Sequence, residues 1–303
     1  MSGLRFSIVL CTKNRAHLLE SALASIAAID YPNGAFELVL VDNGSTDGTR
    51  ALVDRFRGSV SFDVRYAFEE RPGLSAARNR GIREARGEYV FFTDDDQHVD
   101  SKVLAEHERV AVRFGARVQQ GGIELRFIAE RPRWLEGELA AVLGETARLS
   151  EGPQNIALYG GNMCFRREVF TSSIAFREDL GKGAAGYSED IEITRRLEAA
   201  GERVVYAPSA RIFHVIGHDR AKVAFFVKNS FEKGSSDGLM LDPHTALLGV
   251  AGDAAVGLVR AAIGLGFGAV TMNSHRVIKA QARAANLVGR CYAFARRRLS
   301  APR

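Results

Sequence analysis

Short apolar runs alternate with amphipathic stretches over the first third of the chain. Two of these runs, Phe6–Cys11 and Glu37–Asp42, have the length and apolar content of buried strands. The first is followed by a helical repeat of apolar residues at Leu18–Ile26 that a Tyr-Pro-Asn-Gly sequence ends. The second is followed by a turn of capping residues and a helix around Leu52–Phe56. This order predicts right-handed parallel crossovers and a doubly wound, mostly parallel α/β sheet.

An aromatic run further along ends in three consecutive acids. Tyr89–Thr93 is long enough for a buried strand, and Asp94, Asp95 and Asp96 follow it directly. Asp42 ends an earlier strand in the same way, so we expect the carboxylates to meet at one edge of the sheet. Ligands bind at that edge in open α/β sheets, and carboxylates suit Mg²⁺ or Mn²⁺ that carries a diphosphate. Taken alone, these acids are also explained as a solvated turn and, for Asp42, as a helix cap.

Arginines are concentrated between the second strand and the acidic run. A third strand is predicted at Val64–Phe68 and a helix at Leu74–Arg86. We expect the arginines of this helix to form mostly a solvated face; they are Arg78, Arg80, Arg83 and Arg86. Arg71, in the preceding loop, and Arg78 lie near enough to the predicted ligand edge to meet a nucleotide.

Composition fits either one large α/β domain or one domain with appendages. The chain has 303 residues, of which 46% are hydrophobic, enough for a sizeable core. Its cysteines, Cys11, Cys164 and Cys291, are far apart, which indicates neither a disulfide framework nor a zinc site and fits the cytoplasm. The apolar run at the N-terminus is too short for a signal peptide.

Positive charge is concentrated at the C-terminal end. Nine of the Lys and Arg residues, and no acid, follow Asp253, so the net charge of +5 leaves the preceding chain mildly acidic. Asp253 and Arg260 interrupt the apolar residues 245–272, so no run reaches the roughly 20 residues of a membrane span. Two interpretations stay open: these helices lie on an anionic inner membrane surface, or they pack on the rest of the chain or on a second subunit of a homodimer. Nucleic acid is not expected as a partner.

Four motifs in order resemble a known family. They are Ser7-Ile8-Val9 with Thr12 and Arg15, the sequence VDNGSTDGT at 41–49, GLSAARN at 73–79, and TDDD at 93–96. Together they are similar to the family 2 glycosyltransferases of the GT-A fold, over roughly residues 5–235. The resemblance implies a GT-A domain at 1–240, with a nucleotide-sugar-binding half at about 1–115 and an acceptor-binding, catalytic half at 116–240. A basic helical extension at 241–303 follows.

The resemblance also implies a donor site and a metal site. The donor is expected to be UDP-linked, with Asp42 accepting a hydrogen bond from the base. The residues implied for nucleotide-sugar binding are Thr12, Asn14, Arg15, Asp42, Arg71, Arg78, Asp94 and Asp95. Those implied for a divalent cation, Mn²⁺ or Mg²⁺, are Asp94, Asp96 and His214, with His218 as a less favoured substitute. From the residues alone, a histidine beside apolar neighbours is more often part of a core or sheet edge.

The base and the acceptor site are implied in the second half of the chain. Ser188-Glu189-Asp190 begins a predicted helix, and as local sequence it is an acidic N-terminal cap. The resemblance implies that Asp190 is the general base of an inverting transfer and that Glu189 orients the acceptor. The residues implied for acceptor binding are Gly160, Gly161, Asn162, Glu189 and Trp134, the last of which is otherwise a packing anchor. Gly121 and Gly122 predict a bulge or backbone close to a ligand.

The resemblance therefore implies a metal-dependent, inverting glycosyltransferase that acts on a saccharide or lipid-linked acceptor. It would work in the cytoplasm or on the inner face of the membrane. Residues 215–240 lack the QxxRW-type motif of processive relatives, which favours transfer of one or a few sugars. The alternatives are a nucleotidyltransferase, which the lack of glycine in Thr12–Arg15 disfavours, and a catalytically silent nucleotide-sugar-binding scaffold at the membrane.

Overall fold

A computed structural model of the chain describes residues 3–146, 149–171, 173–184, 186–241, 247–270 and 273–300. Contacts divide the chain into a sheet unit and a helical unit. The sheet unit comprises Met1–Arg126, Gly144–Asp179 and Glu189–Val215. The helical unit comprises Phe127–Leu143, Leu180–Ser188 and Ile216–Arg303. Contacts thus divide the chain before helix α7 (Val223–Leu239), because α7 packs against helix α9 (Ser274–Ser300). The domain boundary at residue 240 stays a prediction.

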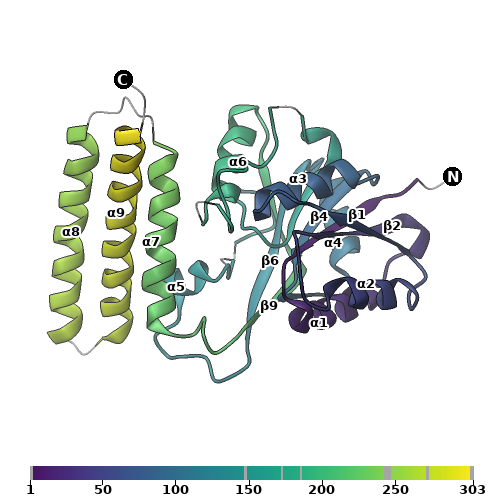
Figure 1. Cartoon of the computed structure of the whole chain (residues 1–303), viewed down its shortest axis with the longest axis horizontal. Helices are drawn as coiled ribbons and strands as arrows, with labels where there is room; N and C mark the ends of the chain where they lie inside the picture. Colours follow the sequence, from purple (N-terminus) through teal and green to yellow (C-terminus); the bar gives the residue numbers. More distant parts are fainter. Residues whose placement is uncertain are drawn as a thin grey trace. The chain divides into compact units, whose positions relative to one another are not determined.

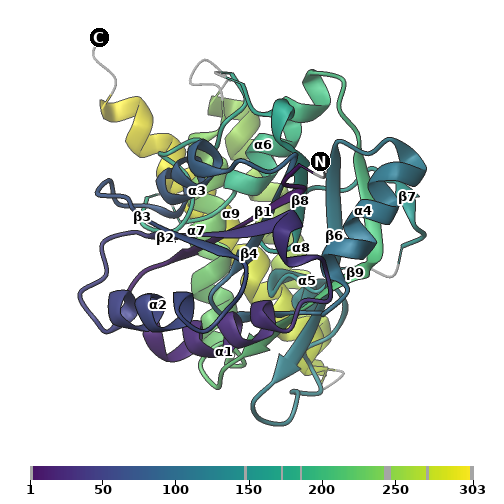
Figure 2. The ribbon, with the colours of Figure 1, turned by 90° about the vertical axis from the view of Figure 1, so that its right-hand side faces the viewer.

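Parallel strands form the first half of the sheet. β1 (Phe6–Thr12) lies between β2 (Phe36–Asp42) and β4 (Tyr89–Asp94), and β3 (Asp63–Phe68) pairs with β2 (Figure 2). The helices that follow the first three strands are α1 (Ala16–Ala27), α2 (Thr49–Arg57) and α3 (Leu74–Glu84), with a short 3₁₀ turn at Asn33–Ala35.

Alternate residues of the central strand face two apolar layers. Ile8 belongs to a core cluster with Leu19 of α1, whereas Val9 belongs to another cluster with Ala77 of α3. Burial on both faces is what a strand with a continuous apolar run requires. The doubly wound α/β architecture predicted from the sequence is confirmed.

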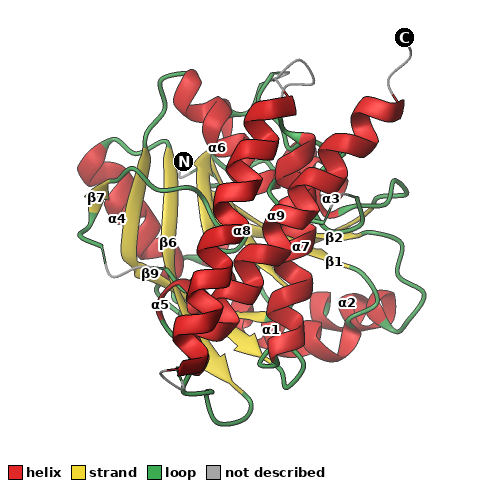
Figure 3. Cartoon of the chain, turned by 90° about the vertical axis from the view of Figure 1, so that its left-hand side faces the viewer, coloured by secondary structure: helices red, strands yellow, loops and turns green. Residues whose placement is uncertain are grey.

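Antiparallel strands complete the sheet, which is therefore mixed. From β4 the order continues β8 (Met163–Arg166), β6 (Val118–Phe127), β9 (Val204–Ile216) and β5 (Gln97–Val99), while β7 (Gly152–Pro153) pairs with β9. Figure 3 shows β6 and β9 side by side. The remaining helical segments of the sheet unit are α4 (Val103–Phe114), α6 (Glu189–Ala199) and a 3₁₀ turn at Arg167–Val169.

Close packing explains the paired glycines of β6. A Cβ atom at Gly121 would collide with the side chain of Asn162, and one at Gly122 would lie 2.6 Å from the carbonyl oxygen of Pro208. Protein atoms therefore occupy the space beside both glycines. The expectation of a bulge or of a ligand at this position is not needed to explain them.

Helices make up most of the helical unit. α9 lies between α7 and α8 (Leu247–Val270), and the short α5 (Gly137–Val142) belongs to the same unit (Figure 1). A Cβ atom at Gly289 of α9 would collide with the carbonyl oxygen of Phe231 in α7. The two helices therefore pack with their backbones in contact. Among the described residues, no helix is both long and apolar enough to cross a membrane.

Candidate active site

The acidic run lies where β4 ends. Asp94 is the last residue of the strand, and Asp95 and Asp96 form the turn to β5. The side chain of Gln97 holds this turn, because its amide oxygen accepts from the Asp94 backbone N–H at 3.0 Å and its Nε2 donates to Asp94 Oδ2 at 3.1 Å. Asp95 and Asp96 are buried.

Arg15 compensates the charge of these buried acids. Its guanidinium donates to Asp95 Oδ1 and, at 2.8 Å, to Asp96 Oδ2. Thr12 at the end of β1 donates its hydroxyl to Asp95 Oδ2 at 2.8 Å. Burial raises the pKa of Asp95 to about 7, although Arg15 and the Thr12 hydroxyl act in the opposite direction.

The end of β2 meets the same edge. Register pairs Thr12 with Asp42 and Cys11 with Asp94, so the carboxylates end strands on either side of β1. Asp42 is buried and accepts from the Ser45 backbone N–H at 2.7 Å and from the Tyr66 hydroxyl at 2.8 Å. The predicted convergence of Asp42 and Asp94 at one edge of the sheet is confirmed.

Asn14 ties the loops after β1 and β2 together. Its backbone has a φ of 52°, its side-chain oxygen accepts from the Thr46 N–H at 2.7 Å, and its own N–H donates to Ser45 Oγ at 2.9 Å. The left-handed conformation is one that asparagine tolerates well. The loop after β1 is therefore fixed against the loop that follows Asp42.

Arg78 connects the acidic strand end to the predicted catalytic pair. Its side chain is only 2% exposed, and its guanidinium donates to Glu189 Oε1 at 2.8 Å and to the Gly160 carbonyl oxygen at 3.0 Å. The same guanidinium lies 3.7 Å from Asp94 Oδ1. The expectation that Arg78 belongs to a solvated face is therefore wrong, because α3 turns this position inward. Arg80 and Arg83, on the same helix, do expose much of their side chains.

Asp190 joins this cluster through the backbone. Its Oδ2 accepts from the Gly160 N–H at 3.0 Å, and its Oδ1 accepts from the Ile191 N–H at 2.8 Å. The carbonyl oxygen of Gly160 therefore accepts a hydrogen bond from Arg78, and its N–H donates one to Asp190. A Cβ atom at Gly160 would lie 2.8 Å from the Arg78 guanidinium, which explains why glycine occupies this position.

A buried polar network supports the Gly160 turn from behind. Asn162 is fully buried with a φ of 61°, and its Nδ2 donates to the carbonyl oxygens of Gly122 and Ala210 at 2.8 and 2.7 Å. Its Oδ1 must then accept from Nε2 of His107 at 2.9 Å. The side chain of Asn162 thus holds strands together, and its contact with an acceptor stays a prediction.

The protonation of His107 follows from its partners. Nε2 carries the proton given to Asn162, and burial lowers the pKa of the ring, so Nδ1 is an acceptor. His107 Nδ1 lies 3.2 Å from the side-chain oxygen of Gln119, which is also an acceptor. The side-chain nitrogen of Gln119 is buried without a hydrogen-bond partner. With the Gln119 amide turned to present its NH₂ group, the neutral ring is satisfied on both sides.

His214 lies next to Asp96. β9 pairs antiparallel with β5 so that His214 is opposite Gln97, and its Nε2 is 3.7 Å from Asp96 Oδ1. Neighbouring ligands of an octahedral ion with bonds of about 2.1 Å are about 3 Å apart, so this oxygen–nitrogen pair fits a divalent cation after a small adjustment. No group of three or more possible metal-ligating His, Cys, Asp or Glu side chains is found among the described residues.

Two predicted residues lie outside this cluster. Arg71 is 53% exposed and pairs with Glu69 at 2.9 Å and with Glu178 at 2.7 Å. Trp134 belongs to the helical unit, where its ring packs edge-to-face on Phe226 with centroids 5.2 Å apart. Contact of Arg71 with the donor and of Trp134 with the acceptor stay predictions.

Comparison with known proteins identifies the family. Residues 7–172 match the model of Glycosyl transferase family 2. The chain belongs to this family. The family 2 resemblance drawn from the four sequence motifs is thereby confirmed, and the protein is a glycosyltransferase.

Curated relatives extend the likeness of this glycosyltransferase beyond the matched segment. It is 28% identical over 242 residues to the succinoglycan biosynthesis protein ExoM of Rhizobium meliloti (strain 1021), covering 78% of this chain and 75% of that protein. It is 26% identical over 250 residues to the glucosyl-dolichyl phosphate glucuronosyltransferase of Haloferax volcanii, covering 78% of this chain and 77% of that protein.

Solved structures share its fold. The mannosyltransferase PcManGT from Pyrobaculum calidifontis, solved with GDP-Man and Mn²⁺, has a TM-score of 0.67 at 22% identity and covers 98% of this chain and 87% of its own. The S. aureus TarS 1-349 structure with UDP-GlcNAc has a TM-score of 0.55 at 18% identity and covers 97% and 92%. These likenesses support the GT-A architecture of this glycosyltransferase.

Sequence reasoning missed the polar residues that hold the site in place. Gln97 fixes the acidic turn, and Gln120 accepts from the Tyr159 N–H at 2.8 Å and donates to the carbonyl oxygen of Gly161. The available signal for His107 was its spacing of three and four residues from Val103, Leu104, Val110 and Ala111, which puts it on the apolar face of a helix, where a buried polar group needs partners.

Proposed function

We propose that this glycosyltransferase moves a sugar from a UDP-sugar to a saccharide or lipid-linked acceptor, with inversion and with a divalent cation. The observation that carries the proposal is the position of Arg78, which links the Glu189-Asp190 pair and the acidic end of β4 in one cluster. Glu189 and the Gly160 carbonyl accept from Arg78, and Asp94 lies 3.7 Å from its guanidinium. A donor diphosphate and a base need to be held on either side of a sugar, and this cluster brings the groups for both together.

Asp190 is the base in this proposal. The acceptor hydroxyl oxygen attacks the anomeric carbon as the bond from that carbon to the diphosphate oxygen breaks, and the hydroxyl proton passes to the Asp190 carboxylate. The N–H groups of Gly160 and Ile191 each donate a hydrogen bond to one carboxylate oxygen, which fixes the orientation of the carboxylate. Glu189, fixed by Arg78, orients the acceptor.

The loops after β1 and β2 bind the nucleotide. Asp42 accepts a hydrogen bond from the nucleobase. The residues that complete the donor site are Thr12, Asn14, Arg15, Arg71, Arg78, Asp94 and Asp95. UDP is supported by the TarS structures solved with UDP and with UDP-GlcNAc, and GDP is the competing nucleotide because PcManGT was solved with GDP-Man.

Asp96 and His214, whose nearest atoms lie 3.7 Å apart, would hold the cation, and Asp94 would join them when the ion and the diphosphate bind. Oxygen ligands together with one imidazole favour Mn²⁺ and admit Mg²⁺. When bound, the ion neutralises charge on the departing nucleoside diphosphate. Arg15 keeps Asp96 in place from the other side, through its 2.8 Å hydrogen bond to Oδ2.

Replacement of the base tests the proposal. Asp190→Asn is expected to reduce release of nucleoside diphosphate about 10²- to 10⁴-fold, because a general base contributes a factor of that order. Affinity for UDP with Mn²⁺, measured by calorimetry, is expected to stay unchanged. Asp54→Asn, an exposed aspartate of α2, is the matched control.

The assay also separates the alternatives. UDP-sugars and GDP-mannose are supplied with Mn²⁺ and simple glycoside acceptors, and release of nucleoside diphosphate is measured. In a parallel assay, UTP and a sugar 1-phosphate are supplied with Mn²⁺, and release of pyrophosphate is measured. Pyrophosphate as the product would favour a nucleotidyltransferase, and no turnover with any donor would favour a binding scaffold. Unimpaired turnover by Asp190→Asn would remove this residue from the role of base.

A further inference from the structure

Helix α8 packs on α9 through a narrow stripe of small residues. The stripe consists of Gly257, Ala261, Gly264 and Gly268. Added Cβ atoms would meet Leu287 at Gly257, Ala280 at Gly264 and Val277 at Gly268, all of them residues of α9. Small residues at such spacing let two helices approach closely. The rest of the circumference of α8 is therefore left available for other contacts.

An apolar sector of α8 is exposed. Val256, Val259 and Ile263 are 54%, 58% and 67% exposed. Their spacing of three and four residues places them on one side of the helix. Large exposed apolar side chains on one side of a helix are typical of an interaction surface.

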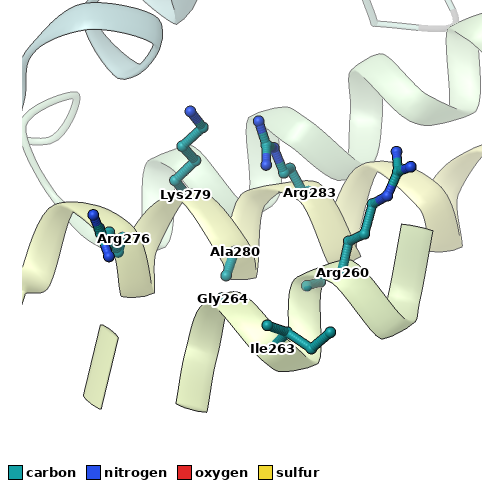
Figure 4. A pocket seen from close by; sticks show the side chains of 8 residues that line it. Arg260, Ile263, Gly264, Arg276, Lys279, Ala280 and Arg283 are labelled. Carbon is teal, nitrogen blue, oxygen red and sulfur yellow. The ribbon is translucent and has the colours of Figure 1, made fainter. Parts of the chain in front are cut away.

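Four cations lie beside this sector. Arg260 of α8 and Arg276, Lys279 and Arg283 of α9 line a cavity of about 310 Å³, which Ile263 also lines (Figure 4). The described residues that line this cavity include no acid. Glu138 of α5 pairs with Lys279 at 2.6 Å and with Arg283 at 3.3 Å, so one carboxylate offsets part of the charge of the four positive groups.

We propose that this α8–α9 surface binds the phosphates of an anionic membrane lipid. Arg260, Arg276, Lys279 and Arg283 contact the lipid phosphates, and the Val256–Ile263 sector enters the boundary between headgroups and acyl chains. Cations and apolar side chains on adjoining faces are what an anionic bilayer surface requires, and each Lys or Arg near such a surface adds to affinity.

Charge decides against the other occupants. No acidic residue follows Asp253, so a second copy docked on this face would bring positive groups against positive groups. A nucleic acid backbone would satisfy the cations but would leave the Val256–Ile263 sector in water. A bilayer with anionic lipid satisfies both parts of the surface.

Vesicle sedimentation of the full chain tests the proposal. The chain is expected to bind vesicles of phosphatidylcholine with phosphatidylglycerol and to bind phosphatidylcholine alone much more weakly. The double variant Arg260→Gln/Arg276→Gln is expected to lose about 25-fold in affinity, since each charge near the surface is worth a factor of about five. Ile263→Ser is expected to weaken the part of vesicle binding that persists at high salt, because that part comes from apolar contacts.

Matched controls and contrary outcomes are defined. Arg57→Gln/Arg113→Gln removes the same charge from exposed positions of the sheet unit and is expected to keep binding. The proposal is overturned by equal loss in this control, by equal binding to neutral vesicles, or by no vesicle binding. It is also overturned if only inorganic phosphate or glycerol phosphate raises the melting temperature, or if the surface forms a dimer instead. Circular dichroism verifies that each variant is folded. None of these outcomes depends on the base role of Asp190.

Discussion

The sheet unit and the helical unit use charge and packing in opposite ways. In the sheet unit, Arg78, Asp95 and Asp96 are buried, and each is held by hydrogen bonds or ion pairs from distant parts of the chain. In the helical unit, Arg260, Ile263 and Arg283 line an open cavity, and glycine contacts hold the helices together.

The difference fits the roles that we propose for the two units. Buried and paired charges are costly to assemble but keep their geometry, which suits a site that has to place a base against a reacting atom. Exposed cations on glycine-packed helices keep their hydration until a partner replaces it, which suits a surface that binds a fluid ligand. Four substitutions sharpen this contrast, and the one with the largest expected effect removes Arg78.

Arg78→Met should be the most damaging. It leaves Glu189 buried without its cation, and breaking a buried pair costs about 3–5 kcal/mol. For a chain of this size we expect a fall in melting temperature of about 10 °C, together with loss of transfer. Scanning calorimetry and the nucleotide-release assay measure the two effects.

Two further variants assign the cause. Arg80→Met, on the same helix but 38% exposed, should cost little. Arg78→Met/Glu189→Gln should recover part of the stability but not the activity. If the single and double variants are equally unstable, Arg78 acts by packing and not through its charge.

Gly289→Ala should separate two helices of the helical unit. The added methyl group collides with the Phe231 carbonyl of α7, and overpacking of this kind costs about 1–3 kcal/mol. A Cβ atom at Gly266, on α8, meets nothing within 4 Å, so Gly266→Ala is the matched control and should be neutral or stabilising. UDP affinity that falls together with stability in Gly289→Ala would show that the units do not act independently.

His107→Phe should slow transfer without changing donor affinity. It leaves Asn162 Oδ1 buried without a donor, at a cost of about 1–3 kcal/mol, and loosens the turn that positions Gly160 beside Asp190. We expect a lower kcat at an unchanged KM for the donor, with His107→Gln restoring part of it by supplying an N–H donor. A rise in KM with constant kcat would contradict a positioning role.

The same residue predicts a dependence of stability on pH. The folded-state pKa of His107 is lowered by burial, so protonation favours the unfolded chain, and stability falls as the pH drops below about 6.5, the ordinary histidine pKa. His107→Gln should lack this component. Denaturant unfolding of both proteins between neutral and mildly acidic pH measures the difference.

Glu138→Gln should have the smallest effect on stability. Glu138 is 66% exposed, and exposed pairs contribute about 0–1 kcal/mol. Removal of its charge should nevertheless raise affinity for anionic vesicles a few-fold, because Lys279 and Arg283 lose a competing carboxylate. Unchanged or weaker vesicle binding would count against the lipid-phosphate surface.

Local sequence determined the elements and the edge at which the chemistry gathers. Apolar runs of strand length, each followed by polar residues, specify the parallel half of the sheet. Carboxylates at strand ends, such as Asp42 and Asp94, can be placed together from that pattern, because parallel strands share one carboxyl edge. The excess of cations after Asp253 is likewise visible in the sequence.

Tertiary structure alone decided which polar residues became internal. Arg78 and Glu189 are 111 positions apart, and neither a solvated nor a buried arginine can be inferred from a helix whose inward face is unknown. The same holds for Asn162, whose partners come from α4, β6 and β9. A buried polar group is stable only where distant segments supply its hydrogen bonds, and that supply is a property of the folded chain and not of the local sequence.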